Sequence, residues 1–177
     1  RTIITPTGKS ALVSGGTYGW IIDEEAELQS LLASLNNKED INREPAYQQM
    51  AASHGEIDWG NTYAEVDLTQ QKMWYISEGN VVFEANVVTG LPTAKRRTPT
   101  GVYDCLEKMQ DKGLKGEVQS DGSREYETPA EYWMRATWTG TGFDTATWQP
   151  YFGGGRYISN GSYGCINMSM QDSITLY

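Results

Sequence analysis

The chain has 177 residues, the size of one domain with a small appendage. Its 38% of hydrophobic residues can build a core, so the composition excludes a disordered chain. The net charge of −9 argues against nucleic acid as the main partner, because phosphate binding needs a positive surface. No apolar run reaches the ~18 residues that span a membrane, and no signal-peptide pattern is present, so we expect any targeting or anchoring segment to lie outside this sequence.

Residues 1–58 predict a small α/β module. A helix is expected after Asp23, a good N-cap, because four leucines follow at helical spacing: Leu28, Leu31, Leu32 and Leu35. A helix of about 12 residues is marginal by itself, so we expect this leucine face to cover a short sheet of the same module. Residues 50–58 are predicted to form a linker, in which the single histidine, His54, is an exposed residue.

Residues 59–177 predict a mostly β domain. Residues 63–68 alternate strictly, as a half-buried strand does, and a turn at residues 77–80 joins the predicted strands 72–76 and 81–89. Further strands are expected at residues 102–105, 132–134 and 155–157, with a polar loop at 113–122. A helix is expected from residue 170, with Ser169 as its cap. The predicted class is therefore a β-rich, sandwich-like domain with a small α/β module, α+β taken together.

The stretch from residue 160 to 168 carries the most chemical information. Cys165 directly follows Gly164 and is flanked by Ser162 and Asn167. A glycine there lets a substrate carbonyl approach the sulfur and lets backbone N–H groups point at a developing oxyanion. The alternative is a small buried structural cysteine. Two cysteines do not make a disulfide scaffold, so we expect Cys105 and Cys165 to be free thiols.

Residues 162–167, Ser-Tyr-Gly-Cys-Ile-Asn, resemble the nucleophile motif of the YkuD-type L,D-transpeptidases, which reads Ser-His-Gly-Cys, an apolar residue, then Arg or Asn. Further segments follow in the order of that family: 63–68 with 72–75, 88–90, 98–103, 132–134, 142–143, 148–149 and 153–154. Residues 15–23 resemble the small peptidoglycan-binding module that precedes the catalytic domain in Gram-positive members. The resemblance covers nearly the whole chain.

The resemblance implies a cysteine acyl-enzyme that forms 3→3 cross-links between peptidoglycan stem tetrapeptides, on the cell-wall side of a Gram-positive-type bacterium. It implies no cofactor and no metal, and carbapenem-type inhibitors as further ligands. Cys165 matches the nucleophile, and the backbone at Tyr163, Gly164 and Cys165 matches the oxyanion hole. The implied substrate-binding residues are Trp133, Met134, Ser162 and Asn167.

Two departures concern the motif histidines. Asp144 occupies the position of the family's histidine base, and Tyr163 stands where the family has its second histidine. A carboxylate of pKa ~3.9 would accept the proton of a thiol of pKa ~8.5 at a cost of about 6 kcal/mol. The sequence therefore predicts an impaired transpeptidase, and the alternative is a non-catalytic peptidoglycan-binding relative.

Two further features complete the expectations. The basic run Lys95, Arg96 and Arg97 either meets stem-peptide carboxylates or forms a solvated loop. Family domains usually continue into one more strand after the helix that follows the motif, so the end at Tyr177 is expected to be a truncation.

Overall fold

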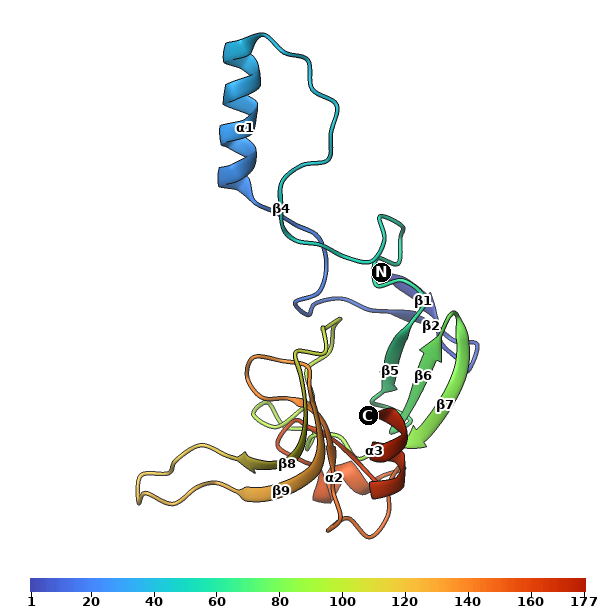
Figure 1. Ribbon diagram of the computed structural model, residues 1–177. Helices are drawn as coiled ribbons and strands as arrows, with labels where there is room; N and C mark the ends of the chain where they lie inside the picture. Colours follow the sequence, from blue (N-terminus) through green and yellow to red (C-terminus); the bar gives the residue numbers. More distant parts are fainter.

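Two β-sheets form the body of the protein in the computed structural model, which describes residues 1–177 (Figure 1). The first is an antiparallel meander of β5 (Tyr63–Asp67), β6 (Lys72–Ser77) and β7 (Asn80–Asn86). The second has the order β11-β10-β9-β8, built from β8 (Glu107–Lys115), β9 (Glu127–Arg135), β10 (Gly142–Thr145) and β11 (Ile166–Met168). β10 and β11 are parallel, and the other pairs are antiparallel. The predicted mostly β class is confirmed.

The hydrophobic core joins the two sheets. Alternation along β6 and β7 turns Met73 and Ala85 inward, and alternation along β11 turns Ile166 and Met168 toward them. Met73, Val87 and Met168 are completely buried. This core fixes the position of β11, and with it the residues that immediately precede β11.

The meander follows the sequence prediction closely. β5 and β6 pair in register, and a two-residue turn at Glu78 and Gly79 joins β6 to β7. Both turn residues have positive φ, 50° and 79°, which is the geometry of the tight turns whose twist matches a β-hairpin. Asn80 therefore pairs directly with Ser77.

Two short helices flank the second sheet. α2 (Arg156–Asn160) lies in the connection from β10 to β11, and α3 (Met170–Leu176) follows β11 and contacts β9 and β10. Ser169 caps α3 by accepting a hydrogen bond from the Asp172 N–H, as predicted. No helix of the protein is both long enough and apolar enough to cross a membrane.

Three of the expected secondary-structure assignments are wrong. Residues 102–105 form no strand and make only an isolated bridge at Val102. Residues 113–115 belong to β8 and not to a loop, because they pair with β9. Residues 155–157 form the N-cap and the first residues of α2 instead of a strand, since the chain must cross from β10 to a parallel neighbour there.

The N-terminal segment carries two small sheets and one long helix. β1 (Thr2–Ile4) pairs with β2 (Ser10–Leu12), and β3 (Ile21–Ile22) pairs with β4 (Tyr47–Gln49). α1 (Glu24–Asn37) is capped by Asp23, which accepts from the Ala26 N–H, as predicted. In Figure 1, α1 extends away from the two large sheets.

The prediction that the leucine face of α1 covers its own sheet is wrong. The helix has no buried residue, and its four leucines remain 43–74% exposed. Their spacing correctly predicted a helix, because one face of a helix repeats every three to four residues. The same spacing does not say which surface, if any, covers that face.

Backbone contacts attach the N-terminal segment to the β domain. The N–H groups of Thr17 and Tyr18 donate to the carbonyl of Val102, and the Val102 N–H donates to the carbonyl of Gly15. Gly16 permits this approach, since a Cβ at that position would lie 2.0 Å from the Val102 oxygen. The segment is therefore held against the loop that precedes β8.

Candidate functional site

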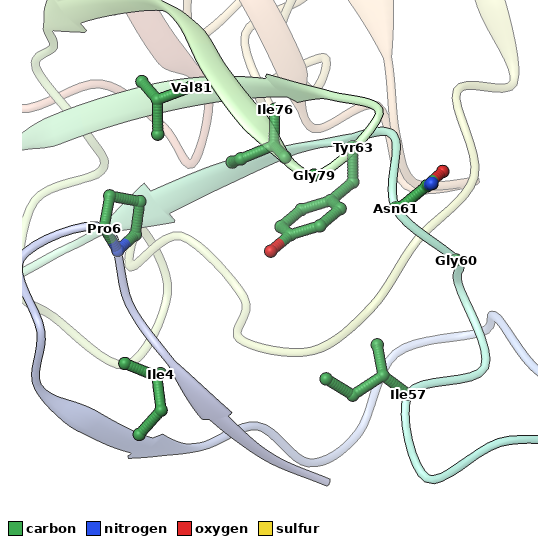
Figure 2. A pocket seen from close by; sticks show the side chains of 9 residues that line it. All are labelled: Ile4, Pro6, Ile57, Gly60, Asn61, Tyr63, Ile76, Gly79 and Val81. Carbon is green, nitrogen blue, oxygen red and sulfur yellow. The ribbon is translucent and has the colours of Figure 1, made fainter.

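One cavity lies between the N-terminal segment and the meander (Figure 2). It measures about 270 Å³ and is walled mainly by aliphatic side chains, including Ile4, Pro6, Ile57 and Ile76. Tyr63 is its only titratable side chain, and its pKa is raised by burial and by the nearby Glu65 charge. The cavity holds no nucleophile with a base, so we do not assign acyl chemistry to it.

A second cavity, of about 150 Å³, contains the residues that the sequence singled out. Its lining comes from β8, β9, β10, β11 and the connection before β11: Leu114, Tyr126, Thr128, Asp144, Trp148, Gln149, Asn160, Gly161, Ser162, Tyr163, Cys165 and Asn167. The structure thus brings together a thiol, a carboxyl group, three side-chain amides and two phenols.

Strand pairing explains why Asp144 lies near Cys165. Asp144 in β10 pairs directly with Asn167 in β11, so the two side chains share one face of the sheet. Cys165 precedes Asn167 by two residues and belongs to that same face. Asn167 Nδ2 donates a 2.7 Å hydrogen bond to Asp144 Oδ1. The opposite face of these strands carries Ile166 into the core.

The Cys165 thiol is held in its neutral form. The residue is 8% exposed, and its Sγ donates a weak 3.6 Å hydrogen bond to the carbonyl of Gly140. Burial raises the pKa of the thiol far above its ordinary value, and the Asp144 charge raises it further, while a hydrogen bond from the Gly142 backbone opposes both. A thiol in this state is a poor nucleophile at neutral pH.

The pKa of Asp144 is shifted from its ordinary value as well. It is 2% exposed, and burial raises its pKa from 3.8 to about 7, against the lowering effect of the hydrogen bond from Asn167. Near neutral pH the carboxyl group is therefore about half ionised. The raised pKa of Asp144 is still lower than the pKa of the Cys165 thiol. Proton transfer from Cys165 to the Asp144 carboxylate therefore remains unfavourable.

Ser162 fixes the backbone on both sides of the thiol. Its Oγ donates to the carbonyl of Cys165 at 2.6 Å and accepts from the N–H of Gly164 at 3.0 Å. The Gly164 N–H is consequently occupied. The N–H groups of Tyr163 and Cys165 have no partner within the protein, so these two, and not that of Gly164, remain available to a ligand oxygen.

Gly164 is required by the shape of this turn. Its φ is 124°, a conformation that side-chain-bearing residues rarely adopt. Its carbonyl accepts a 2.8 Å hydrogen bond from the buried hydroxyl of Thr98, and that hydroxyl in turn accepts from the N–H of Gly90. The loop from residue 89 to 98 thus supports the turn that presents Cys165.

Tyr163 forms one wall of the cavity and is contacted on its ring and its hydroxyl. The Arg96 guanidinium lies over the ring, 3.6 Å from its centroid, and donates a 2.6 Å hydrogen bond to the Tyr163 hydroxyl. The Tyr126 ring is 4.7 Å away at a tilt of 40°. Burial raises the pKa of Tyr126, and the Cys165 and Asp144 charges raise it further, so its hydroxyl stays protonated.

Comparison with known proteins places this arrangement in a family. The sequence model of the YkuD L,D-transpeptidase catalytic domain matches residues 61–177. The crystal structure of an Enterococcus faecium L,D-transpeptidase, a cysteine-to-serine mutant, superimposes with a TM-score of 0.81. That chain is 34% identical, and the match covers 99% of this chain and 68% of that one.

The chain belongs to the L,D-transpeptidase family.

Two related structures carry covalent adducts. The Ldtfm–avibactam carbamoyl enzyme is 34% identical with a TM-score of 0.81, over 99% of this chain and 67% of that one. The catalytic domain of the E. faecium L,D-transpeptidase acylated by ertapenem is 42% identical with a TM-score of 0.57, over 69% of this chain and 90% of that one. No curated protein sequence matches the chain.

Two residues that the resemblance implies as substrate-binding, Trp133 and Met134, are not among the residues that line the cavity of Cys165. Trp133 and Met134 are consecutive residues of β9 and point to opposite faces, and they are 2% and 5% exposed. Trp133 pairs with Asp144 and therefore shares the face of the sheet that carries Asp144, whereas Met134 pairs with Phe143 on the core side. Neither residue lines the cavity that contains Cys165. The aromatic walls there come from Trp148, which lies in one of the segments that resemble the family, and from Tyr126, which lies in none of them.

The single histidine of the chain does not enter the site. His54 lies in the N-terminal segment, where its ring stacks on Trp20 at 4.0 Å, and its side chain is 60% exposed. It does not line the cavity of Cys165. The thiol therefore has no imidazole partner in this structure.

Proposed function

We propose that this chain is a peptidoglycan L,D-transpeptidase that uses Cys165 as an acyl-accepting nucleophile and that works slowly because Asp144 replaces the base. The observation that carries the proposal is the turn at residues 162–165. It presents the thiol beside two unpartnered backbone N–H groups, those of Tyr163 and Cys165, in a cavity. Such N–H groups stabilise the oxyanion of a tetrahedral intermediate.

The proposed reaction has two acyl transfers. The Cys165 sulfur attacks the carbonyl of the third, L-centre-bearing residue of a stem tetrapeptide, and the C–N bond to D-Ala breaks, so that D-Ala leaves with a proton on its amine. An amine of a second stem then attacks the thioester, and the thiol is released as the 3→3 cross-link forms. The covalent adducts of avibactam and ertapenem in related enzymes support acyl chemistry of this kind.

The slow step in this proposal is formation of the thiolate. Cys165 must lose its proton, and the nearest titratable group, Asp144, has a pKa of about 7. Against an ordinary thiol pKa of about 8.5 the transfer is uphill by about 2 kcal/mol, and the burial of Cys165 increases that cost. Loss of a positioned general base costs a factor of about 10² to 10⁴ in rate.

The proposed domain organisation and cellular location of the protein are those of the family it belongs to. Residues 1–58 act as a peptidoglycan-binding-like module joined to the catalytic domain, residues 59–177, and the protein works on the cell-wall side of a Gram-positive-type bacterium. Stem peptides and carbapenem-type inhibitors are the proposed ligands of the cavity. The neutral, buried thiol favours one second candidate, a relative that binds peptidoglycan without reacting with it.

Turnover of a synthetic stem tetrapeptide tests the proposal. The chain is incubated with the tetrapeptide and an amine acceptor, and released D-Ala and cross-linked product are quantified by mass spectrometry. We expect slow product formation that disappears in Cys165→Ala and speeds up in Asp144→His. Binding of the tetrapeptide without product in both the parent and Asp144→His would favour the non-catalytic candidate.

A further inference from the structure

The cavity of Cys165 is too small for a peptide as it stands. Its volume is about 150 Å³, whereas ligand pockets are typically about 300–1,000 Å³. A tetrapeptide must therefore extend beyond the lining residues or separate the walls. Two of these walls face each other, with Tyr163 on the turn before β11 and Tyr126 at the start of β9.

Ion pairs join these two walls. Glu125, which precedes Tyr126, lies 3.2 Å from Lys95 Nζ and 3.5 Å from Arg96 Nη2. Glu117, on the other arm of the same hairpin end, lies 3.6 Å from Lys95 Nζ. Residues 116–126 are thus tied to the loop that carries Lys95 and Arg96, and Arg96 in turn contacts Tyr163. Opening the cavity requires these pairs to separate.

Arg96 is prepared to bind an anion other than Glu125. Stacking on the Tyr163 ring and the hydrogen bond to its hydroxyl orient the guanidinium, while Nε and Nη1 have no hydrogen-bond partner in the protein. Nε and Nη1 lie on different edges of the guanidinium, and each edge also contains Nη2, so a carboxylate that takes the place of Glu125 beside Nη2 can form a forked pair with Nη2 and either of them. Residues 95–97 are also the only run of three basic residues in a chain of net charge −9.

We propose that Arg96, assisted by Lys95, binds the carboxylate of the incoming peptide in exchange for Glu125, and that this exchange opens the wall formed by residues 116–126. The carboxylate is the C-terminal one, because it lies one residue beyond the carbonyl that Cys165 attacks. Arg96 contacts Tyr163, which lies two residues before Cys165 in the same turn. The inference rests on the proposed function for the identity of the ligand. It assigns Arg96 a role in substrate selection and not in bond breaking.

Arg97 provides a matched control. It neighbours Arg96 and carries the same charge, but its side chain is exposed and makes no ion pair or hydrogen bond. Replacing either arginine by glutamine changes the net charge equally. A difference between the two variants therefore reports position and not the overall electrostatic field.

Calorimetric titration in the full chain with Cys165→Ala, where no chemistry can occur, tests the inference. The probes are L-Ala-D-isoglutamine-L-Lys-D-Ala, whose only carboxylate is C-terminal, and its C-terminal amide. Arg96→Gln should weaken binding of the acid about tenfold and leave the amide unchanged, since a hydrogen-bonded charge is lost. Arg96→Lys should restore part of the affinity, and Arg97→Gln should change neither. Glu125→Gln should tighten binding of the acid, because the competing carboxylate is removed.

Three results would overturn the inference. One is equal weakening by Arg96→Gln and Arg97→Gln, which indicates bulk charge. Another is weakening of the acid by Glu125→Gln, which indicates that Glu125 only supports the wall. The third is equal binding, or no binding, of the acid and the amide to the Cys165→Ala protein. Any of these leaves the proposed function standing if Cys165 is acylated, since acylation is measured separately.

Discussion

Asp144→His should restore a working base to Cys165. Asp144 and Cys165 line the same cavity and lie on one face of paired strands, and the Asp144 charge is one of the causes that raise the pKa of the thiol. The substitution removes that charge and supplies an imidazole that can accept the thiol proton. An opposite charge within about 4–6 Å lowers a pKa by about 1–3 units. We expect acylation by a carbapenem to accelerate by about 10²-fold or more at pH 7.

The assay is the pH dependence of the acylation rate, followed by loss of β-lactam absorbance. Asp144→Asn is the matched control, because it removes the charge without adding a base and should give only a small gain. Tyr163→His should also do much less, since Tyr163 is held by Arg96. Circular dichroism and thermal unfolding establish that each variant is folded. A folded Asp144→His that reacts no faster than Asp144→Asn would refute the reasoning.

Three further predictions concern the stability of the site. Burial raises the pKa of Asp144 from 3.8 to about 7, so the free energy of unfolding of the parent should fall as pH rises from about 4 to 7. Asp144→Asn lacks this titration, so its free energy of unfolding relative to the parent should increase by up to about 4 kcal/mol between pH 4 and pH 7 and no further above pH 7. Urea unfolding at pH 4 to 8 measures the difference. Gly164→Ala should lose about 1–3 kcal/mol in the same assay and also slow acylation, because φ at this position is 124°; an unchanged midpoint would mean that the turn is not held there. Ser162→Ala should lose about 1–2 kcal/mol, since its Oγ hydrogen-bonds both Gly164 and Cys165, and an unchanged unfolding curve would contradict this.

Local patterns sufficed where neighbouring residues decide the structure. The strict alternation of residues 63–68 predicted β5, and the leucine spacing with Asp23 as cap predicted α1. Both signals come from periodicity, which a sequence displays directly. The hairpin turn was predicted at residues 77–80 from its turn-forming residues, and it lies at Glu78 and Gly79.

The sequence pattern did not reveal which segments pair or pack with each other in the folded protein. β8 is rich in charged residues and contains Gly113, so its pattern is typical of a loop, and only its pairing with β9 makes it a strand. The four leucines of α1 predicted a covered face that remains exposed, because helical spacing does not identify a partner surface.

For the site, the motif located Cys165 and the position of Asp144, but not their surroundings. The burial that raises both pKa values follows from the packing of β10 and β11. The wall residue Tyr126 and the contact of Arg96 with Tyr163 join segments far apart in the chain. The placement of Trp133 and Met134 in the groove came from the resemblance, and the alternation along β9 separates them.

The central claim is that Cys165 is a reactive but slow acyl acceptor. Intact-mass analysis after prolonged incubation with ertapenem at pH 8, followed by peptide mapping, tests it most directly. Cys105 is an exposed free thiol and serves as an internal reference for non-specific reaction. The account predicts a single adduct on Cys165 that forms slowly in the parent, forms faster in Asp144→His and is absent in Cys165→Ala. An adduct on Cys105 alone, or no adduct in either the parent or a folded Asp144→His, would contradict it.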